Sequence, residues 1–190
     1  AQVGLFVDNI EKGAMARKTI GNVSVLGQLG NSMDSGVIPT FLRKFVGEGV
    51  SAPIDAYNAM LNSTALSLKG KGTGPMTDQD FDNLLSTAGA ISASPEARKI
   101  VQQALTDNAR IALQISDISS RAVSNDINRL EAIRQINKLM QSSPLTKEMK
   151  ARLNVLTSGG SATGSGGGKT IKQINAELVA LQKQRDALAN

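Results

Sequence analysis

The sequence predicts an all-α fold, in the form of an elongated helical assembly protein with a long central helix and a C-terminal heptad helix. Apolar residues recur at helical spacing over most of the 190 residues. Neither glycine nor proline occurs between Pro95 and Pro144, which leaves room for one long helix. A run rich in glycine and serine, residues 158–169, then separates this region from a segment with heptad spacing. This layout is typical of proteins that bind partners or copies of themselves.

Composition argues against catalysis. The chain contains no cysteine, histidine or tryptophan. Zinc sites built from cysteine and histidine are therefore excluded, as are Ser-His-Asp and Cys-His catalytic sites within the chain. Aromatic residues make up only 3% of the sequence against 41% apolar residues, which favours close-packed helices over an aromatic-lined ligand pocket. We expect no enzyme activity, no cofactor and no metal.

Residues 1–90 are expected to form a compact bundle of helices interrupted by glycines. Each glycine weakens a helix by about 1 kcal/mol relative to alanine. The first thirty or so positions contain five: Gly4, Gly13, Gly21, Gly27 and Gly30. Further helices are predicted to start near Pro39 and Pro53, and a short one at the capping-box-like Thr77-Asp-Gln-Asp80. We expect that short helix to end at Gly89.

Residues 91–157 are predicted to hold a long helix and a short one. Ser94-Pro95-Glu96 is a strong helix start, and an unbroken helix from there to Ser143 would be roughly 70 Å long. Its apolar stripe continues through Leu130 and Met140 but slips by one position near residues 122–123, so we expect a bend at 119–125. The alternative is two antiparallel helices, although their turn would contain no glycine. The short helix is expected over 146–156.

The C-terminal part is predicted to be a flexible linker, residues 158–169, followed by a coiled-coil-like helix, residues 170–190. Its seam repeats at heptad spacing, with a basic residue in one apolar position: Ile171, Ile174, Leu178, Leu181, Arg185 and Leu188. Fewer than three repeats are marginal for an isolated helix in water. We therefore expect this segment to dock on itself or on a partner.

Three motifs invite a ligand-binding interpretation. The loop Lys69–Gly74 has the glycine density of a phosphate loop, but acids begin the next helix, so a simple connector is favoured. The stretch 166–170 resembles the end of a P-loop but lacks its first glycine, which favours a linker. The acids of the short helix, Asp78, Asp80 and Asp82, are better explained by the helix dipole than by a metal.

Basic residues give the chain a net charge of +5. The candidate DNA or phosphate contacts are Lys69, Lys71, Arg110, Arg121, Arg129 and Arg134. No aromatic residues interleave with them, so any contact with double-stranded DNA would be nonspecific. The alternative is a solvated helix face or salt bridges between subunits. The amphipathic, basic stretch 41–46 could rest on a membrane surface as a peripheral contact, or be an ordinary core helix.

The segment Ala59–Ala104 shows a particular order of helix ends. A helix runs into a Lys-Gly loop at 69–72, a Thr77-Asp start and a Leu84-Leu85 pair follow, and Ser94-Pro-Glu opens the next helix. This order resembles virion-associated proteins of tailed bacteriophages, including internal and DNA-ejection proteins. The resemblance covers about a quarter of the chain and carries no catalytic signature. The heptad helix after a linker departs from that family.

The resemblance implies a structural role in the virion and, during infection, in the host cell envelope. Such proteins assemble with copies of themselves and other virion proteins into a conduit for genome delivery. Side-by-side long helices would place basic residues along the passage. The alternative is a non-viral helical adaptor or scaffold that recruits a partner through its heptad helix. The opening residues, which resemble the interior of a protein, suggest a fragment or a processed product.

Overall fold

The computed structural model describes residues 2–33, 37–42, 52–72 and 74–158, and these form helices and turns without any strand. The prediction of an all-α fold is confirmed. The elements are α1 (Gln2–Ser32), η2 (Thr40–Leu42), α3 (Pro53–Leu68), α4 (Asp78–Ser86), α5 (Ala88–Ala93), α6 (Pro95–Val123), α7 (Arg129–Met140) and α8 (Lys147–Ser158).

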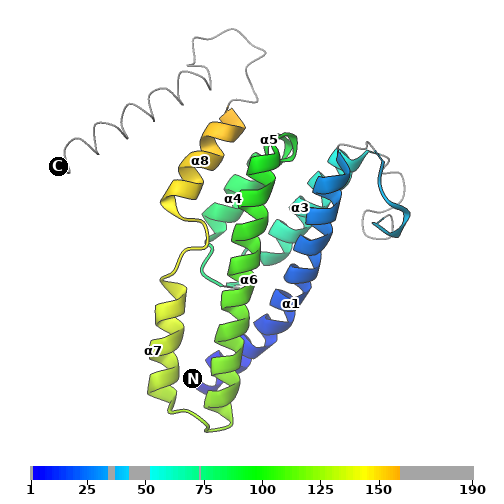
Figure 1. The fold of residues 1–190 in the computed structure, drawn as a ribbon. Coiled ribbons are helices and arrows are strands. Elements are labelled where there is room, and N and C mark those ends of the chain that lie inside the picture. Colours follow the sequence, from blue (N-terminus) through cyan, green and yellow to red (C-terminus); the bar gives the residue numbers. More distant parts are fainter. Residues whose placement is uncertain (1, 34–36, 43–51, 73, 159–190) are drawn as a thin grey trace, which may run out of the picture.

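The molecule is an elongated bundle built around α6 (Figure 1). Helix α1 lies antiparallel to α6 and contacts it more extensively than any other pair of elements in the described chain. Helices α3, α4, α5 and α8 surround the first half of α6, whereas α7 lies beside its second half (Figure 1). The bundle is therefore thick at one end. At the other end, which we call the slender end, only the start of α1, the end of α6 and the start of α7 pack together.

The glycines do not interrupt α1, which is one helix of 31 residues, so that prediction was wrong. Packing along α6 compensates for the low helix propensity of glycine. Gly13 is buried where α1 approaches α6, and a Cβ there would lie 2.7 Å from the Cβ of Ser116. Ser116 Oγ also donates a hydrogen bond to the Ile10 carbonyl at 3.4 Å. Glycine at position 13 thus permits the close approach of the two helices.

The core crosses the boundary that we expected at residue 90. In the thick end, Tyr57 and Leu61 of α3 pack in one cluster with Val101 and Leu105 of α6, and all four side chains are fully buried. Small residues, Ala16 of α1 with Ala109 and Ala112 of α6, join the thick and slender ends. Residues 1–90 are therefore not a separate bundle, because α6 supplies part of their core.

Local sequence signals set most helix starts. Thr77 caps α4 by a complete capping box, in which its hydroxyl accepts from the Asp80 amide and the Asp80 carboxylate accepts from the Thr77 amide. Ser94 caps α6 by accepting from the Ala97 amide at 3.2 Å. The expected end at Gly89 was wrong, since α4 ends at Ser86 and Gly89 lies within α5.

The long central helix is confirmed as α6, but it ends at Val123, inside the stretch 119–125 where we expected a bend, and does not continue to Ser143. The chain turns after Val123, and α7 returns antiparallel along α6 (Figure 1). Our alternative of two antiparallel helices describes this topology, although α6 has 29 residues and α7 only 12. Leu130, expected on the apolar stripe, is 63% exposed because the turn rotates α7 relative to an unbroken helix.

Tyr57 is fully buried in the thick end, and its hydroxyl makes no hydrogen bond within the described part of the chain. Burial raises the pKa of Tyr57 to about 12, although the Gln102 side chain and the Arg98 charge nearby act to lower it. A folded-state pKa above that of the unfolded chain means that stability is lost as the pH rises from about 10 to about 12.

We therefore expect Tyr57→Phe to be neutral or to stabilise the fold by up to about 1 kcal/mol, because it removes an unpaired buried hydroxyl. It should also reduce the loss of stability at alkaline pH. Urea unfolding at neutral and alkaline pH measures both effects. Tyr57→Ala, which should cost about 3–5 kcal/mol, shows that the position is sensitive. A loss above about 1 kcal/mol in the phenylalanine variant would contradict this account.

Candidate interaction surface

The turn between α6 and α7 is built without glycine. Asn125 takes the left-handed conformation, with φ of 63°, which asparagine tolerates better than most residues. The Arg121 carbonyl accepts from the Asp126 amide at 2.8 Å and from the Ile127 amide at 3.3 Å, which closes the end of α6. Asn128 then caps α7 by accepting from the Leu130 amide at 2.8 Å. The turn is thereby fixed by its own hydrogen bonds.

Helix α7 is held by a small apolar cluster. Its two buried residues, Ala132 and Ile136, pack against Phe6 of α1 and against Ile118 and Ala122 of α6. No described helix covers the outer side of α7 as α1 covers α6. This leaves α7 as the most thinly packed of the long elements at the slender end.

An apolar groove runs along the junction of α6 and α7, with a volume of about 740 Å³. Its apolar side chains are Leu113, Ile118 and Leu139, and all three are buried or partly buried. Polar residues form its rims: Gln114, Asp117, Gln135, Lys138 and Ser142. An apolar floor between polar rims is the shape that binds an amphipathic helix.

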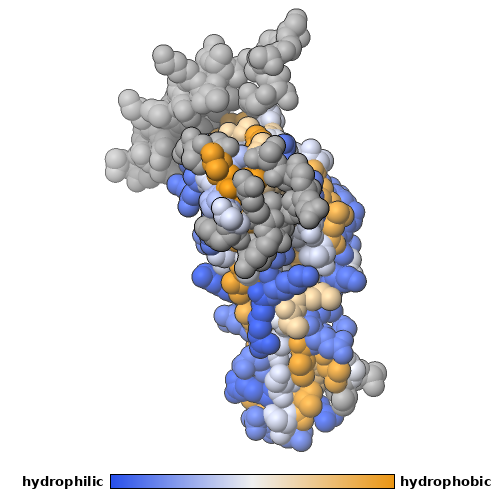
Figure 2. Space-filling model, turned by 90° about the vertical axis from the view of Figure 1, so that its right-hand side faces the viewer, coloured by the Kyte–Doolittle hydropathy of each residue, from blue (hydrophilic) through white to orange (hydrophobic). Residues whose placement is uncertain are grey.

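Further apolar side chains are exposed at the slender end. Leu130 is 63% exposed, Leu5 49%, Val7 44% and Val123 42%. Figure 2 shows apolar side chains gathered in a strip over this lower end of the molecule, on the side formed by α1. These residues belong to the starts of α1 and α7 and the end of α6, so each of the three helices at the slender end exposes apolar side chains that the fold itself does not bury.

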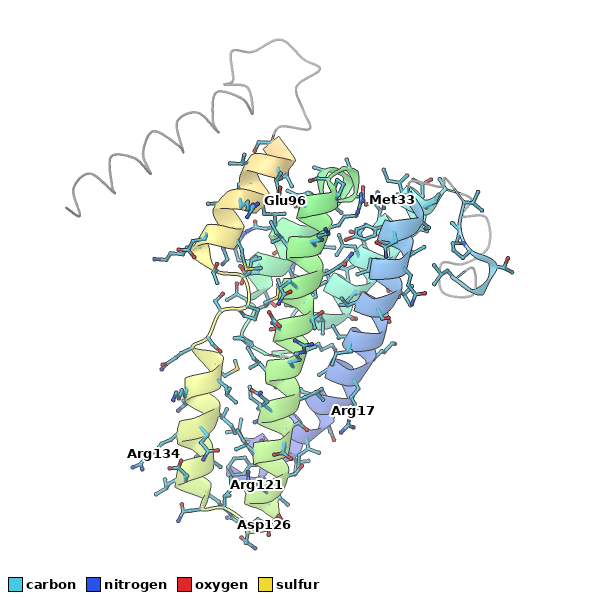
Figure 3. All side chains as sticks on the ribbon, viewed as in Figure 1. Arg17, Met33, Glu96, Arg121, Asp126 and Arg134 are labelled. Atoms are coloured by element: carbon cyan, nitrogen blue, oxygen red, sulfur yellow. The ribbon has the colours of Figure 1, made fainter. Side chains whose placement is uncertain are left out.

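Three of the six predicted basic residues lie near the slender end. Arg121 is in the last turn of α6, Arg129 opens α7, and Arg134 is one turn further along; all are exposed. Figure 3 shows Arg121 close to the turn at Asp126, and Arg134 pointing outward from α7. Arg134 lies 3.9 Å from Glu131, a pair that is too exposed to fix it strongly. These arginines remain accessible to an anionic partner.

The other three are not brought together with them. Lys69 forms an ion pair with Asp82, and Arg110 lies 3.5 Å from Asp107 in the middle of α6. Lys71 lines a small hollow that also contains Asp8 and Glu11 of α1. The six residues therefore do not form one continuous basic face.

The loop after α3 is occupied by the protein's own carboxylates. Its amide at Gly70 donates to Asp78 at 2.7 Å, while Lys69 binds Asp82. Asp80 is buried and binds Lys150 of α8 at 2.6 Å. These acids therefore serve as helix-start residues and as links to the loop and to α8, as the sequence favoured. Among the described residues, no group of three or more potential ligands could hold a metal ion.

Asp80 joins α4 to α8. Burial alone would raise its pKa, but the hydrogen bonds from Lys150 and from the backbone and hydroxyl of Thr77 outweigh burial, and the pKa is lowered. A folded-state pKa below that of the unfolded chain means that Asp80 stabilises the fold above its ordinary pKa. This contribution is lost as the pH falls through the lowered value.

We expect Asp80→Asn to cost about 2 kcal/mol at neutral pH, because it weakens charged hydrogen bonds to two elements. Lys150→Met should cost less, since it leaves the capping box intact. Denaturant unfolding from neutral to acid pH measures these effects. The difference between Asp80→Asn and the parent should shrink as the pH falls through the lowered pKa, and a constant difference would refute the assignment.

Several predicted sites lie outside the described residues. These are the heptad seam of Ile171, Ile174, Leu178, Leu181, Arg185 and Leu188, the P-loop-like stretch 166–170, and most of the amphipathic stretch 41–46. Leu42, the one residue of that stretch whose side chain is described, is buried in the thick-end core. No described helix is long and apolar enough to span a membrane.

The α6–α7 groove was missed at the sequence level. It depends on the turn at Asn125, which brings Leu113 and Leu139 to the same surface. The slip of the apolar stripe near residues 122–123 was the available signal, and it coincides with the end of α6.

Comparisons of the chain with protein-family models, with curated proteins and with solved structures find no match.

Proposed function

We propose that this protein works by assembly, as a structural component of a tailed-phage virion that helps to form the conduit for genome delivery. The observation that carries the proposal is the exposed apolar surface of the slender end, led by Leu130 at 63% exposure. Exposing it does not stabilise a folded monomer, whereas a neighbouring copy or another virion protein would bury it. The order of helix ends over 59–104 supports the virion setting through resemblance.

In this proposal the rod-like bundles pack side by side into a ring or tube. Arg121, Arg129 and Arg134 are exposed near the surface that would be buried. They would then supply nonspecific contacts to phosphates of the passing DNA, without reading its sequence. The same arginines would also form salt bridges between copies, with the nearby acids Asp126 and Glu131 of a neighbouring copy.

The test is to image purified virions of a phage that encodes the chain, before and after genome release. We expect the chain in several symmetric copies, with slender ends in contact and in a changed position after release. Absence of the chain from purified virions would overturn the viral proposal. If a cellular partner were then lost on deleting residues 169–190, the helical adaptor would be the better description.

A further inference from the structure

The α6–α7 groove has the shape of a binding site for one apolar helix face. Its apolar floor extends along α6 from Leu113 to Ile118, and its other rim extends from Gln135 of α7 to Ser142, just after that helix. At 1.5 Å per residue the floor and rim span about 8–10 Å, or roughly two helical turns. The occupant must therefore present apolar side chains over about two turns and accept polar neighbours on both sides.

The chain carries a segment of this description in its own sequence. Leu178 and Leu181 lie on one face of the predicted C-terminal helix, and Arg185 follows on the same face. From Leu178 to Arg185 the helix would extend about 10 Å, which matches the groove. The two leucines would then contact the floor formed by Leu113, Ile118 and Leu139.

Charge favours the same pairing. Asp117 on the α6 rim is exposed and forms no ion pair within the described residues. Arg185 is the basic residue that replaces an apolar one in the seam, and an apolar partner surface would leave it without a counter-ion. Asp117 lies at the edge of the apolar floor, where it would supply one. On the other rim Lys138 would lie near Glu177, which is next to Leu178 beside the seam.

The connection is long enough for the segment to reach its own chain. Residues 159–169 join the end of α8 to the segment, and eleven glycine- and serine-rich residues have a root-mean-square span of about 18 Å. Helix α8, with 12 residues, separates Ser158 from the near end of the groove by roughly the same length. A linker that matches the span gives an effective concentration in the millimolar range, which favours binding within one chain.

We infer that residues 170–190 dock as a helix in the α6–α7 groove of the same chain, with Leu178 and Leu181 on the groove floor and Arg185 paired with Asp117. The inference does not depend on the virion role. It describes a contact in the isolated chain, and the exposed residues at the slender end, such as Leu130, are not part of it.

The test uses the full chain, which has no cysteine of its own, with spin labels at Ser120→Cys on α6 and Lys183→Cys on the outer face of the segment. Pulsed electron paramagnetic resonance should give one narrow, short distance. The double substitution Leu178→Glu with Leu181→Glu should abolish that peak. Asp117→Lys or Arg185→Glu alone should weaken it, and the two together should restore it.

Two results would overturn the inference. The first is a broad distance distribution in the parent chain, which would mean that the groove does not hold the segment. The second is a short distance between two chains that carry one label each, together with loss of the short distance when the doubly labelled chain is diluted with unlabelled chain. That result would make a second copy the occupant of the groove. A narrow distance that survives dilution and follows the charge exchange supports docking within the chain.

Discussion

Replacing Gly74 by alanine should destabilise the fold by about 3 kcal/mol or more, the largest effect that we expect from a single added methyl group. Two penalties combine at this position. Gly74 has φ of 96°, a conformation that residues with a side chain rarely adopt. A Cβ there would also lie 2.7 Å from the backbone oxygen of Asn108, which cannot move without distorting α6.

Gly70 provides the matched control in the same loop. Its φ of 71° is also positive, but no atom lies within 4 Å of the position that a Cβ would take. Gly70→Ala should therefore cost only the conformational penalty, about 1 kcal/mol. Denaturant unfolding measures both variants. Equal losses at the two positions would mean that the contact with Asn108 is not important.

Gly13→Ala should destabilise the fold by about 2 kcal/mol, even though alanine is the better helix former by about 1 kcal/mol. The added Cβ would meet both Cβ and Oγ of Ser116, so α1 and α6 must move apart. This separation would weaken the small-residue packing of Ala16, Ala109 and Ala112 beside it. Thermal or urea unfolding gives the difference.

Two controls separate packing from helix propensity. Gly21 lies in the same helix, and no atom lies within 4 Å of the position that its Cβ would take, so Gly21→Ala should stabilise the fold by about 0.5–1 kcal/mol. Adding Ser116→Gly to Gly13→Ala removes the side chain that clashes and should recover most of the loss. If Gly13→Ala and Gly21→Ala were equally stabilising, the close approach of α1 and α6 would be refuted.

Helix starts could be predicted from sequence because they depend on neighbouring residues. Thr77 and Ser94 cap their helices within three positions of themselves, and both predictions are confirmed. The short helix expected over 146–156 is also found, as α8 (Lys147–Ser158). In each case the information lies within about ten residues.

The errors occurred where distant residues decide the outcome. Gly13 permits contact with Ser116, which lies more than a hundred positions away, so its local effect on helix propensity was misleading. Asn125 takes a conformation that is more usual for glycine, and the turn between α6 and α7 was therefore only the alternative to one long, bent helix. The groove could not be predicted, because it exists only once that turn has brought α7 back along α6.

In the proposed function the apolar slender end drives assembly, and sedimentation tests this as the molar mass of the full chain over a wide range of concentration. We expect the mass to rise with concentration in the parent chain. Leu130→Lys should weaken association at least about tenfold, which corresponds to about 1.4 kcal/mol. Ile54→Lys, at a residue of α3 that is 42% exposed and lies beside Met33 and Pro95 at the thick end, should leave it unchanged. A parent chain that stays monomeric at every concentration, or an equal effect of the two lysines, would contradict the claim.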